Sequence, residues 1–480
     1  VQQLLEQFRL AQHRQFGKRS ESHPGQGELF DEAEAEMGSE ADTAEEPEVE
    51  TISYTRNKPK RKPLPEDLPR EVIVHDIPDE DKVCDCCAGT LHCIGEDKSE
   101  KLQFIPAQVK VIEHVRPKYA CRTCEKDGIS NTVKQAPVPR SVIPKGYATP
   151  SLLSQIITSK YQYGLPLYRQ EAMFKQHGIE LSRKTMADWI IRCAELFKPL
   201  YDQLHQYLLQ QPVIQADETT LKVVDADKST SYMWLYATGA DSPAGKIPGT
   251  AIPNIVLYDY HNSRAGQCAV DFLGGYKGYL QVDGYQGYEQ TQATLVGCWA
   301  HARRKFMEAK KGAGSKGSGK ADWALNHIQK LYRIETQLKD SSSEERYAIR
   351  QEKSLPLLNQ LHTWLTKSVQ QVLPKTKLGE AIQYCLNQWH KLERYTLNGQ
   401  LSIDNNRAER AIKPFVIGRK NWLFSQTATG ANASAILYSI IETAKANDLN
   451  VFEYVMDCLE QLSKPETDIE QLLPWELAKR

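Results

Sequence analysis

The chain has 480 residues, of which 40% are hydrophobic and 25% are charged, and its formal net charge is −1. This composition indicates a globular protein of roughly two to four domains and excludes a polycation that binds nucleic acid through net charge alone. No run approaches about eighteen apolar residues, so we expect no membrane-spanning helix. The chain opens without a signal-peptide pattern, and its 11 cysteines are too sparse for a disulfide scaffold. We therefore expect a cytoplasmic protein.

The N-terminal part predicts a short helix and a charged linker. Apolar residues at Leu4, Leu5 and Phe8 have helical spacing, which indicates a partial helix over 1–20. Residues 21–70 are acidic and then basic, which predicts a disordered linker. Prolines alternate with its cations and favour an extended arm that could follow DNA phosphates, although a solvated linker explains the pattern equally well. The cations of this basic arm are Lys58, Lys60, Arg61 and Lys62.

Two CxxC pairs predict a zinc-finger domain over 71–135, and their cysteines are Cys84, Cys87, Cys121 and Cys124. Each CxxC turn supplies two thiolates, so two turns complete a tetrahedral structural Zn²⁺ site. The segment between the pairs alternates like the strands of a zinc ribbon. Cys86 and Cys93 lie nearby and leave the choice of ligands open.

Residues 141–211 have helical periodicity and predict a helical domain. Within 167–193 the sequence predicts two helices joined by a turn at Gly178, with Ser182 capping the second helix. This pattern resembles a DNA-binding helix-turn-helix, but a pair of helices that only pack together explains it too.

From residue 212 the sequence pattern changes from helical periodicity to β-rich runs that are followed by helical segments, which is typical of an α/β fold. Five β-rich runs, over 212–225, 232–239, 254–263, 278–289 and 293–301, predict five strands, with a helix near 265–276. A Gly/Ser-rich loop then opens a long helical pattern. We therefore predict an α/β core over 212–430 with a helical insertion at about 312–397, followed by a C-terminal helical element over 431–480.

Three acidic residues suggest a catalytic metal site in this core. Asp217 and Asp283 each end an apolar strand, and Glu409 lies in a downstream helix. Phosphoryl transfer uses such carboxylates to hold two Mg²⁺ ions roughly 3.5–4 Å apart. Glu409 has a competing interpretation, because the sequence "NRAE" is a capping box with Asn406 as the N-cap.

Cations next to Glu409 favour the metal interpretation. Arg407, Arg410 and Lys413 surround it, and their surplus positive charge suits a DNA backbone that passes the site. Cys298-x-x-His301 also has the spacing of metal ligands. It lacks a second pair, so we interpret it as a strand-end cysteine and a functional histidine.

These motifs together resemble the insertion sequence 66 family of bacterial transposases. The resemblance covers most of the chain from Arg19 onward and includes "GEDKSEKLQFIPAQVKVIEHVRPKYACRTCE", "QADETTLKV", "YLQVDGYQGYE", "GCWAHARRKF" and "DNNRAERAIKPFVIGRKNWLFS". It implies an RNase H-like core with a DDE triad of Asp217, Asp283 and Glu409, which bind Mg²⁺ or Mn²⁺. The sequence departs from the family at "CDCC", where a plain CxxC is more usual, and at the weakly charged "FSQTATGANAS".

The resemblance implies a DNA transposase. Cleavage at the element's ends would free a 3′ hydroxyl, which would then attack target DNA in the same site. We expect His301, Arg303 and Arg304 to hold DNA, because they follow the fifth strand. Terminal inverted repeats and target DNA are the expected partners, bound by a homo-oligomer in the nucleoid, with element-encoded accessory proteins possible. Two alternatives are an RNase H-like nuclease that performs no strand transfer and a non-catalytic DNA-binding derivative.

Overall fold

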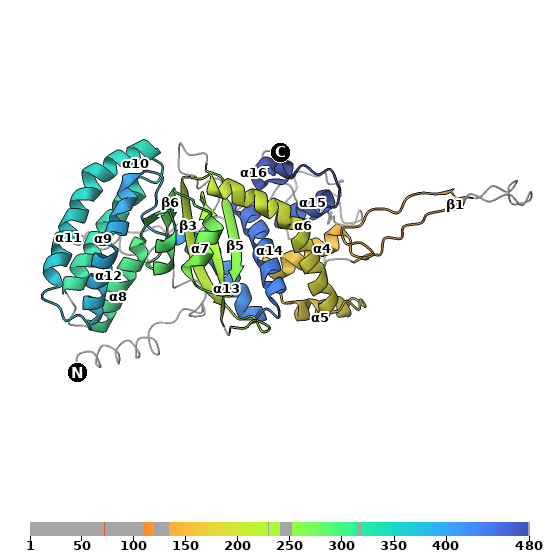
Figure 1. The fold of residues 1–480 in the computed structure, drawn as a ribbon, viewed down its shortest axis with the longest axis horizontal. Coiled ribbons are helices and arrows are strands. Elements are labelled where there is room, and N and C mark those ends of the chain that lie inside the picture. The colour runs from red at the N-terminus through yellow and green to blue at the C-terminus, as the bar shows by residue number, and fades with distance from the viewer. Residues whose placement is uncertain are drawn as a thin grey trace, which may run out of the picture. The chain divides into compact units, whose positions relative to one another are not determined.

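The computed structural model describes residue 72 and residues 109–119, 134–228, 230–240, 252–313 and 319–478 (Figure 1). The chain divides into two compact units, one of Ala44–Ala136 and one of Val1–Thr43 with Pro137–Arg480. In the smaller unit, β1 (Lys118–Tyr119) pairs antiparallel with β2 (Lys134–Gln135). The expected N-terminal helix, the basic arm and the four cysteines of the CxxC pairs lie outside the described residues.

The larger unit contains a five-stranded mixed sheet with the strand order β5-β4-β3-β6-β7. Its antiparallel part consists of β3 (Val213–Leu221), β4 (Ser231–Thr238) and β5 (Ile255–His261). The two short strands β6 (Tyr279–Gln281) and β7 (Thr294–Val296) run parallel to β3. All five predicted strands are confirmed, and the fold is mixed α/β.

The remaining elements are mainly helices. Three precede the sheet: α4 (Pro150–Tyr161), α5 (Leu167–Gln176) and α6 (Arg183–Leu209). Within the sheet region lie α7 (Gly266–Leu273) and the 3₁₀ helix η4 (Gln286–Gln290). Next come α8 (Trp299–Ala313), α9 (Gly319–Gln337), α10 (Ser343–Ile349), the π-helical η5 (Arg350–Ser354), α11 (Leu355–Ser368), α12 (Lys377–Leu392) and η6 (Glu393–Leu397). The last are α13 (Asn406–Trp422), α14 (Ala428–Ala446), α15 (Val451–Leu462), η7 (Ile469–Leu472) and α16 (Pro474–Leu477). No helix among the residues described above is both long and apolar enough to cross a membrane.

The predicted helix pair before the sheet is present. Gly178 has a φ of +74° and reverses the chain after α5, a conformation that glycine adopts at little cost. Ser182 then caps α6, because its hydroxyl accepts a hydrogen bond from the backbone N–H of Thr185 at 3.1 Å. The buried face of α6 joins the same hydrophobic core as the sheet, α14 and α15. The helical segments that flank the sheet in sequence therefore share one core with it.

Helices cover both faces of the sheet. In the antiparallel register Asp217 lies opposite Leu235, which lies opposite Tyr258, so these three side chains point to one face. The Tyr258 ring lies 6.1 Å from the ring of Phe415, which places α13 over that face. On the other face Tyr236 of β4 stacks on an aromatic ring of α7. Asp217 therefore points toward the helix that carries Glu409.

A second hydrophobic core is formed by the helices that follow β7. It contains Trp299 and Phe306 of α8 together with Ile328 of α9, Leu361 of α11 and Ile382 of α12. The predicted helical insertion is thus an α-helical bundle with its own interior. Its packing already includes α8, which begins before the predicted boundary at residue 312.

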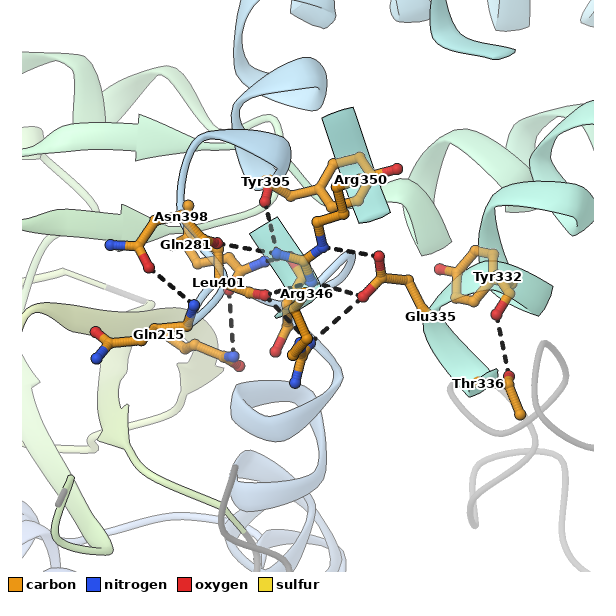
Figure 2. Close-up of polar contacts among 12 residues, drawn as sticks. Gln215, Gln281, Tyr332, Glu335, Thr336, Arg346, Arg350, Tyr395, Asn398 and Leu401 are labelled. Atoms are coloured by element: carbon orange, nitrogen blue, oxygen red, sulfur yellow. Dashed lines mark hydrogen bonds and ion pairs between the residues drawn. The ribbon is translucent and has the colours of Figure 1, made fainter. Parts of the chain in front are cut away.

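A buried arginine connects this bundle to the segment that leads into α13 (Figure 2). Arg350 is fully buried and donates two hydrogen bonds to the Glu335 carboxylate, at 2.8 and 2.6 Å. Its guanidinium also donates to the backbone carbonyls of Tyr395, Asn398 and Leu401, at 2.8, 2.9 and 2.8 Å. One planar cation thereby binds three backbone carbonyls of the segment 395–401, as its fork of donors allows.

This arrangement predicts that Glu335→Gln strongly destabilises the bundle. The substitution leaves the guanidinium of Arg350 buried without its counter-charge, and breaking such a buried pair costs about 3–5 kcal/mol. We expect a clearly lower Tm in thermal unfolding followed by circular dichroism. The control is Lys198→Gln in an exposed pair, where both side chains are about half exposed; its effect should stay below about 0.5 kcal/mol. Equal Tm values for the two variants would contradict the assignment.

Candidate active site

The carboxyl ends of the three parallel strands bring together Asp217, Asp283 and Cys298. Gln215 of β3 pairs with Gln281 of β6, which pairs with Val296 of β7. β6 and β7 end at these residues, so Asp283 and Cys298 follow two residues after their strands, while Asp217 follows two residues later within β3. Neighbouring strands are about 4.8 Å apart, so the three residues lie at the same end of the sheet.

Glu409 completes this cluster from α13. Its side chain is 1% exposed. Burial raises the pKa of Glu409 to about 7, and the charges of Asp404 and Asp283 act in the same direction, whereas Arg304 opposes them. Neither carboxylate oxygen has a hydrogen bond of standard geometry, although His301 and Arg304 lie 3.4 and 3.5 Å from them. A carboxylate buried in this way is unfavourable unless a cation neutralises it.

The same repulsion acts on Asp217. Burial raises the pKa of Asp217 well above its usual value, and the charges of Glu218, Glu409 and Asp283 raise it further. Each of these groups must lie close to Asp217 for its charge to be felt. The pairing of β3 with β6 and the contacts of β3 with the start of α13 bring the three predicted acids, which are separated by 66 and 126 residues in sequence, to one end of the sheet.

Hydrogen bonds from β3 hold the N-terminus of α13 in place. The side-chain oxygen of Gln215 accepts the backbone N–H of Ala408 at 3.3 Å, and the side-chain amide of Asn405 donates to the carbonyl of Ala216 at 2.9 Å. The capping-box interpretation of Glu409 is wrong. Asn405, and not Asn406, occupies the cap position, and it makes no side-chain capping bond. Glu409 points into the cluster instead.

His301 and Arg304, on α8, lie on either side of the Glu409 carboxylate. His301 Nδ1 is 3.4 Å from Oε1, and an Arg304 nitrogen is 3.5 Å from Oε2. Burial lowers the pKa of His301 to about 4, with a further contribution from the positive charge of Arg304. The imidazole is therefore neutral near pH 7, and Arg304 supplies the positive charge beside Glu409. Its side chain is 27% exposed and can also be reached from solvent.

Two arginines predicted to hold DNA are buried. Arg303 and Arg407 are each 6% exposed, and Arg407 donates to the backbone carbonyl of Thr238 at 3.0 Å. A buried guanidinium does not reach a phosphate at the surface, so both positions favour a structural role. Arg410 and Lys413 are partly exposed on α13. These last two remain predictions as DNA contacts.

Two acidic residues beside the cluster were not predicted as part of the site. Glu218 points to the opposite face from Asp217, where it accepts hydrogen bonds from Tyr288 at 2.7 Å and from Arg264. Asp404 accepts a hydrogen bond from Tyr332 at 3.0 Å. The adjacent acids in "ADE" and the Asp-Asn-Asn run were the only signals for them in the sequence, and both are common turn or strand patterns.

The Cys298 sulfur accepts a hydrogen bond from the segment before α13. Its side chain is buried, and the backbone N–H of Asn405 donates to Sγ at 3.3 Å. Cys298, His301 and Glu409 form a group of possible metal-ligating side chains whose ligand atoms all lie within 4.8 Å of one another.

Comparison with known proteins gives matches along most of the chain. A family model described as "Transposase IS66 family" matches residues 145–433, and one described as "zinc-finger binding domain of transposase IS66" matches residues 81–125. Models described as "Transposase C of IS166 homeodomain" and "IS66 C-terminal element" match residues 3–73 and 439–475. No solved structure matches the chain.

Several curated relatives from Sinorhizobium fredii (strain NBRC 101917 / NGR234) are similar over most of their length. "Uncharacterized protein y4hP" is 36% identical over 444 residues, which cover 88% of this chain and 78% of the relative. "Uncharacterized protein y4jD" is 36% identical over 426 residues, which cover 86% and 81%. The zinc-finger match spans both CxxC pairs and supports structural zinc. The main match covers more than half of the chain and all three converging acids, and the chain therefore belongs to the IS66 family of transposases.

Proposed function

We propose that this transposase uses Asp217, Asp283 and Glu409 as a DDE triad to cut DNA at the ends of its element and to join those ends to target DNA. The observation that carries the proposal is the convergence of three carboxylates, from β3, from the residues just after β6 and from α13. Burial raises the pKa values of Asp217 and Glu409, and neighbouring acids raise them further. The mixed sheet, with its first aspartate on the central strand and its second just after the parallel neighbour, supports an RNase H-like core.

The cluster fits divalent cations. Oxygen ligands are those that Mg²⁺ and Mn²⁺ take, and Glu409 presents two buried oxygens that make only long contacts, with His301 and Arg304. Asp217, Asp283 and Glu409 would hold the ions. When bound, two such ions activate the attacking oxygen and stabilise the leaving oxygen of an in-line displacement.

The surrounding residues position the acids and the DNA. Gln215 and Asn405 fix the start of α13 and thereby the direction of Glu409. Arg304 offers a positive charge to a phosphate beside the acids. Only the nucleophile differs between the two reactions: water releases a 3′ hydroxyl in the first, and that hydroxyl displaces a 3′ oxygen of target DNA in the second. One site therefore serves both.

The triad predicts that Glu409→Gln abolishes cleavage and joining while the protein still binds element ends. The amide keeps the side chain's size but loses the charge, so cleavage of end-containing DNA with Mg²⁺ should fall on the order of 10³-fold or more. Asp217→Asn and Asp283→Asn should match it, since residues that act as a unit fail together. Glu442→Gln is the matched control, because Glu442 is also a buried helical glutamate. Near-normal cleavage by Glu409→Gln would overturn the triad, and cutting without joining by the wild type would indicate a nuclease.

The raised pKa of Glu409 predicts the sign of a pH effect on stability. In the absence of divalent ions, the Glu409 carboxyl group keeps its proton up to about pH 7 in the folded state, whereas it loses the proton near pH 4.5 in the unfolded chain. Stability therefore falls as pH rises through this window, by roughly 3 kcal/mol in total. Glu409→Gln should raise the Tm at pH 8 and leave it nearly unchanged at pH 4.5. Glu335→Gln, which breaks a structural pair, should lower the Tm at pH 8, and a loss of stability at pH 8 in both variants would contradict the electrostatic assignment.

The basic arm predicts salt-sensitive DNA binding. Replacing Lys58, Lys60, Arg61 and Lys62 with glutamine should reduce the slope of log affinity against log salt by about 0.9 for each phosphate that the arm no longer neutralises. Fluorescence anisotropy over a salt series measures this slope. A matched control removes the same charge from exposed lysines of the helical bundle, at Lys330, Lys339, Lys353 and Lys367. Identical slopes for the arm variant and the wild type would mean that the arm is only a linker.

A further inference from the structure

We propose that Cys298, His301 and Glu409 form a second metal site, which takes a zinc-type cation and shares Glu409 with the carboxylate cluster. A thiolate, an imidazole and a carboxylate are a ligand set that Zn²⁺ takes, and sulfur is not a ligand for Mg²⁺. Their ligand atoms lie within 4.8 Å of one another. Among the described residues, this is the one group of three or more His, Cys, Asp or Glu side chains whose ligand atoms lie this close together. The three side chains come from three places in the fold: the end of β7, the first turn of α8 and the first turn of α13.

The backbone brings Cys298 and His301 to the same side of one helix end. β7 ends at Val296 and α8 begins at Trp299, so Cys298 directly precedes the helix and His301 lies in its first turn. Burial and the charges of Glu409 and Asp404 raise the pKa of the Cys298 thiol well above its ordinary value, so a bound cation has to displace the proton of this thiol. The N-terminus of α8 and the backbone N–H of Asn405, which donates to the sulfur at 3.3 Å, stabilise the thiolate once the cation is bound.

The distances suit a tetrahedral ion. Metal–ligand bonds of about 2.0–2.3 Å in a tetrahedron separate neighbouring ligand atoms by about 3.3–3.8 Å. His301 Nδ1 and Glu409 Oε1 are already 3.4 Å apart. Both atoms are buried and have no hydrogen-bond partner. The sulfur needs a movement on the order of 1 Å toward them, which a change in side-chain torsion can provide.

Arg304 does not exclude an ion at this position. It contacts Oε2 of Glu409, while His301 lies next to Oε1, so the two oxygens face different partners. Three protein ligands leave a fourth position open, as in zinc sites that exchange their ion or bind a water. Since Glu409 would be occupied, an ion here would compete with the divalent ions of the proposed triad. This inhibitory consequence rests on the proposed function, whereas the binding itself does not.

The test is a titration of the full-length protein with Co²⁺, after the zinc-finger domain has been loaded with Zn²⁺ and free zinc removed. Co²⁺ bound to a thiolate gives a charge-transfer absorption in the near ultraviolet, so the band reports a cysteine ligand directly. We expect one equivalent of Co²⁺ to produce this band in the wild type. Cys298→Ser should abolish it, and His301→Gln should weaken Co²⁺ binding by more than about 10-fold. Any Co²⁺ that enters the zinc finger gives the same background in all variants, so the band of the proposed site is the absorption above that background.

Matched variants separate this site from the rest of the protein. Cys385→Ser removes another buried thiol, on α12, and should keep the band. Asp217→Asn should also keep it, although the same variant should lose DNA cleavage; Glu409→Gln should lose both. Failure of this proposal and failure of the triad therefore give different results. An identical band in the wild type and in folded Cys298→Ser or His301→Gln, or no band in the wild type, would overturn the site and leave Cys298 as a structural sulfur.

Discussion

The mutual repulsion of buried carboxylates is the constraint on which this structure depends. Asp217 and Glu409 are held where burial and neighbouring acids both disfavour their charged forms. Such an arrangement lowers the stability of the fold in the absence of cations, so the surrounding structure must impose it. A cation bound between these carboxylates, alone or together with DNA, would remove this repulsion and complete the site.

The surrounding structure imposes the arrangement from two sides. On one side, the parallel pairing of β3, β6 and β7 brings Asp217 of β3, and Asp283 and Cys298 just after the other two strands, to the same end of the sheet. On the other side, the helical bundle anchors the segment before α13 through Arg350, which binds Glu335 and three carbonyls (Figure 2). The bundle therefore does more than separate the second and third acids in sequence. The bundle also fixes the backbone that leads into α13 and thereby helps to position Glu409.

Much of the fold could be predicted because its signals are local. Apolar runs ending in polar residues marked each strand, and the strand-end positions of Asp217 and Asp283 marked one edge of a parallel sheet. The cap of α6 by Ser182 was equally local. Contacts between distant segments carried no such signal. The sequence predicted Arg407 as a surface cation near the start of a helix. It lies in the interior, where its guanidinium donates a hydrogen bond to the carbonyl of Thr238, a residue far away in sequence.

The difference between local signals and long-range contacts also explains why the sequence alone left two interpretations of Glu409. Four residues, "NRAE", describe a capping box and a catalytic glutamate equally well. Only the position of the cap at Asn405, fixed by β3, separates the two. Cys298 and His301 also required the tertiary structure, since a lone CxxH motif becomes a possible ligand group only when α13 brings Glu409 beside it.

The central claim is that Asp217, Asp283 and Glu409 bind the cations that act on DNA. The most direct measurement is a crystal structure of the protein with element-end DNA and Mn²⁺, with anomalous scattering used to locate the metal. The account predicts anomalous peaks within coordination distance of all three carboxylates and of the phosphate to be cut. Well-occupied Mn²⁺ sites elsewhere, with DNA bound and these carboxylates free of metal, would contradict it.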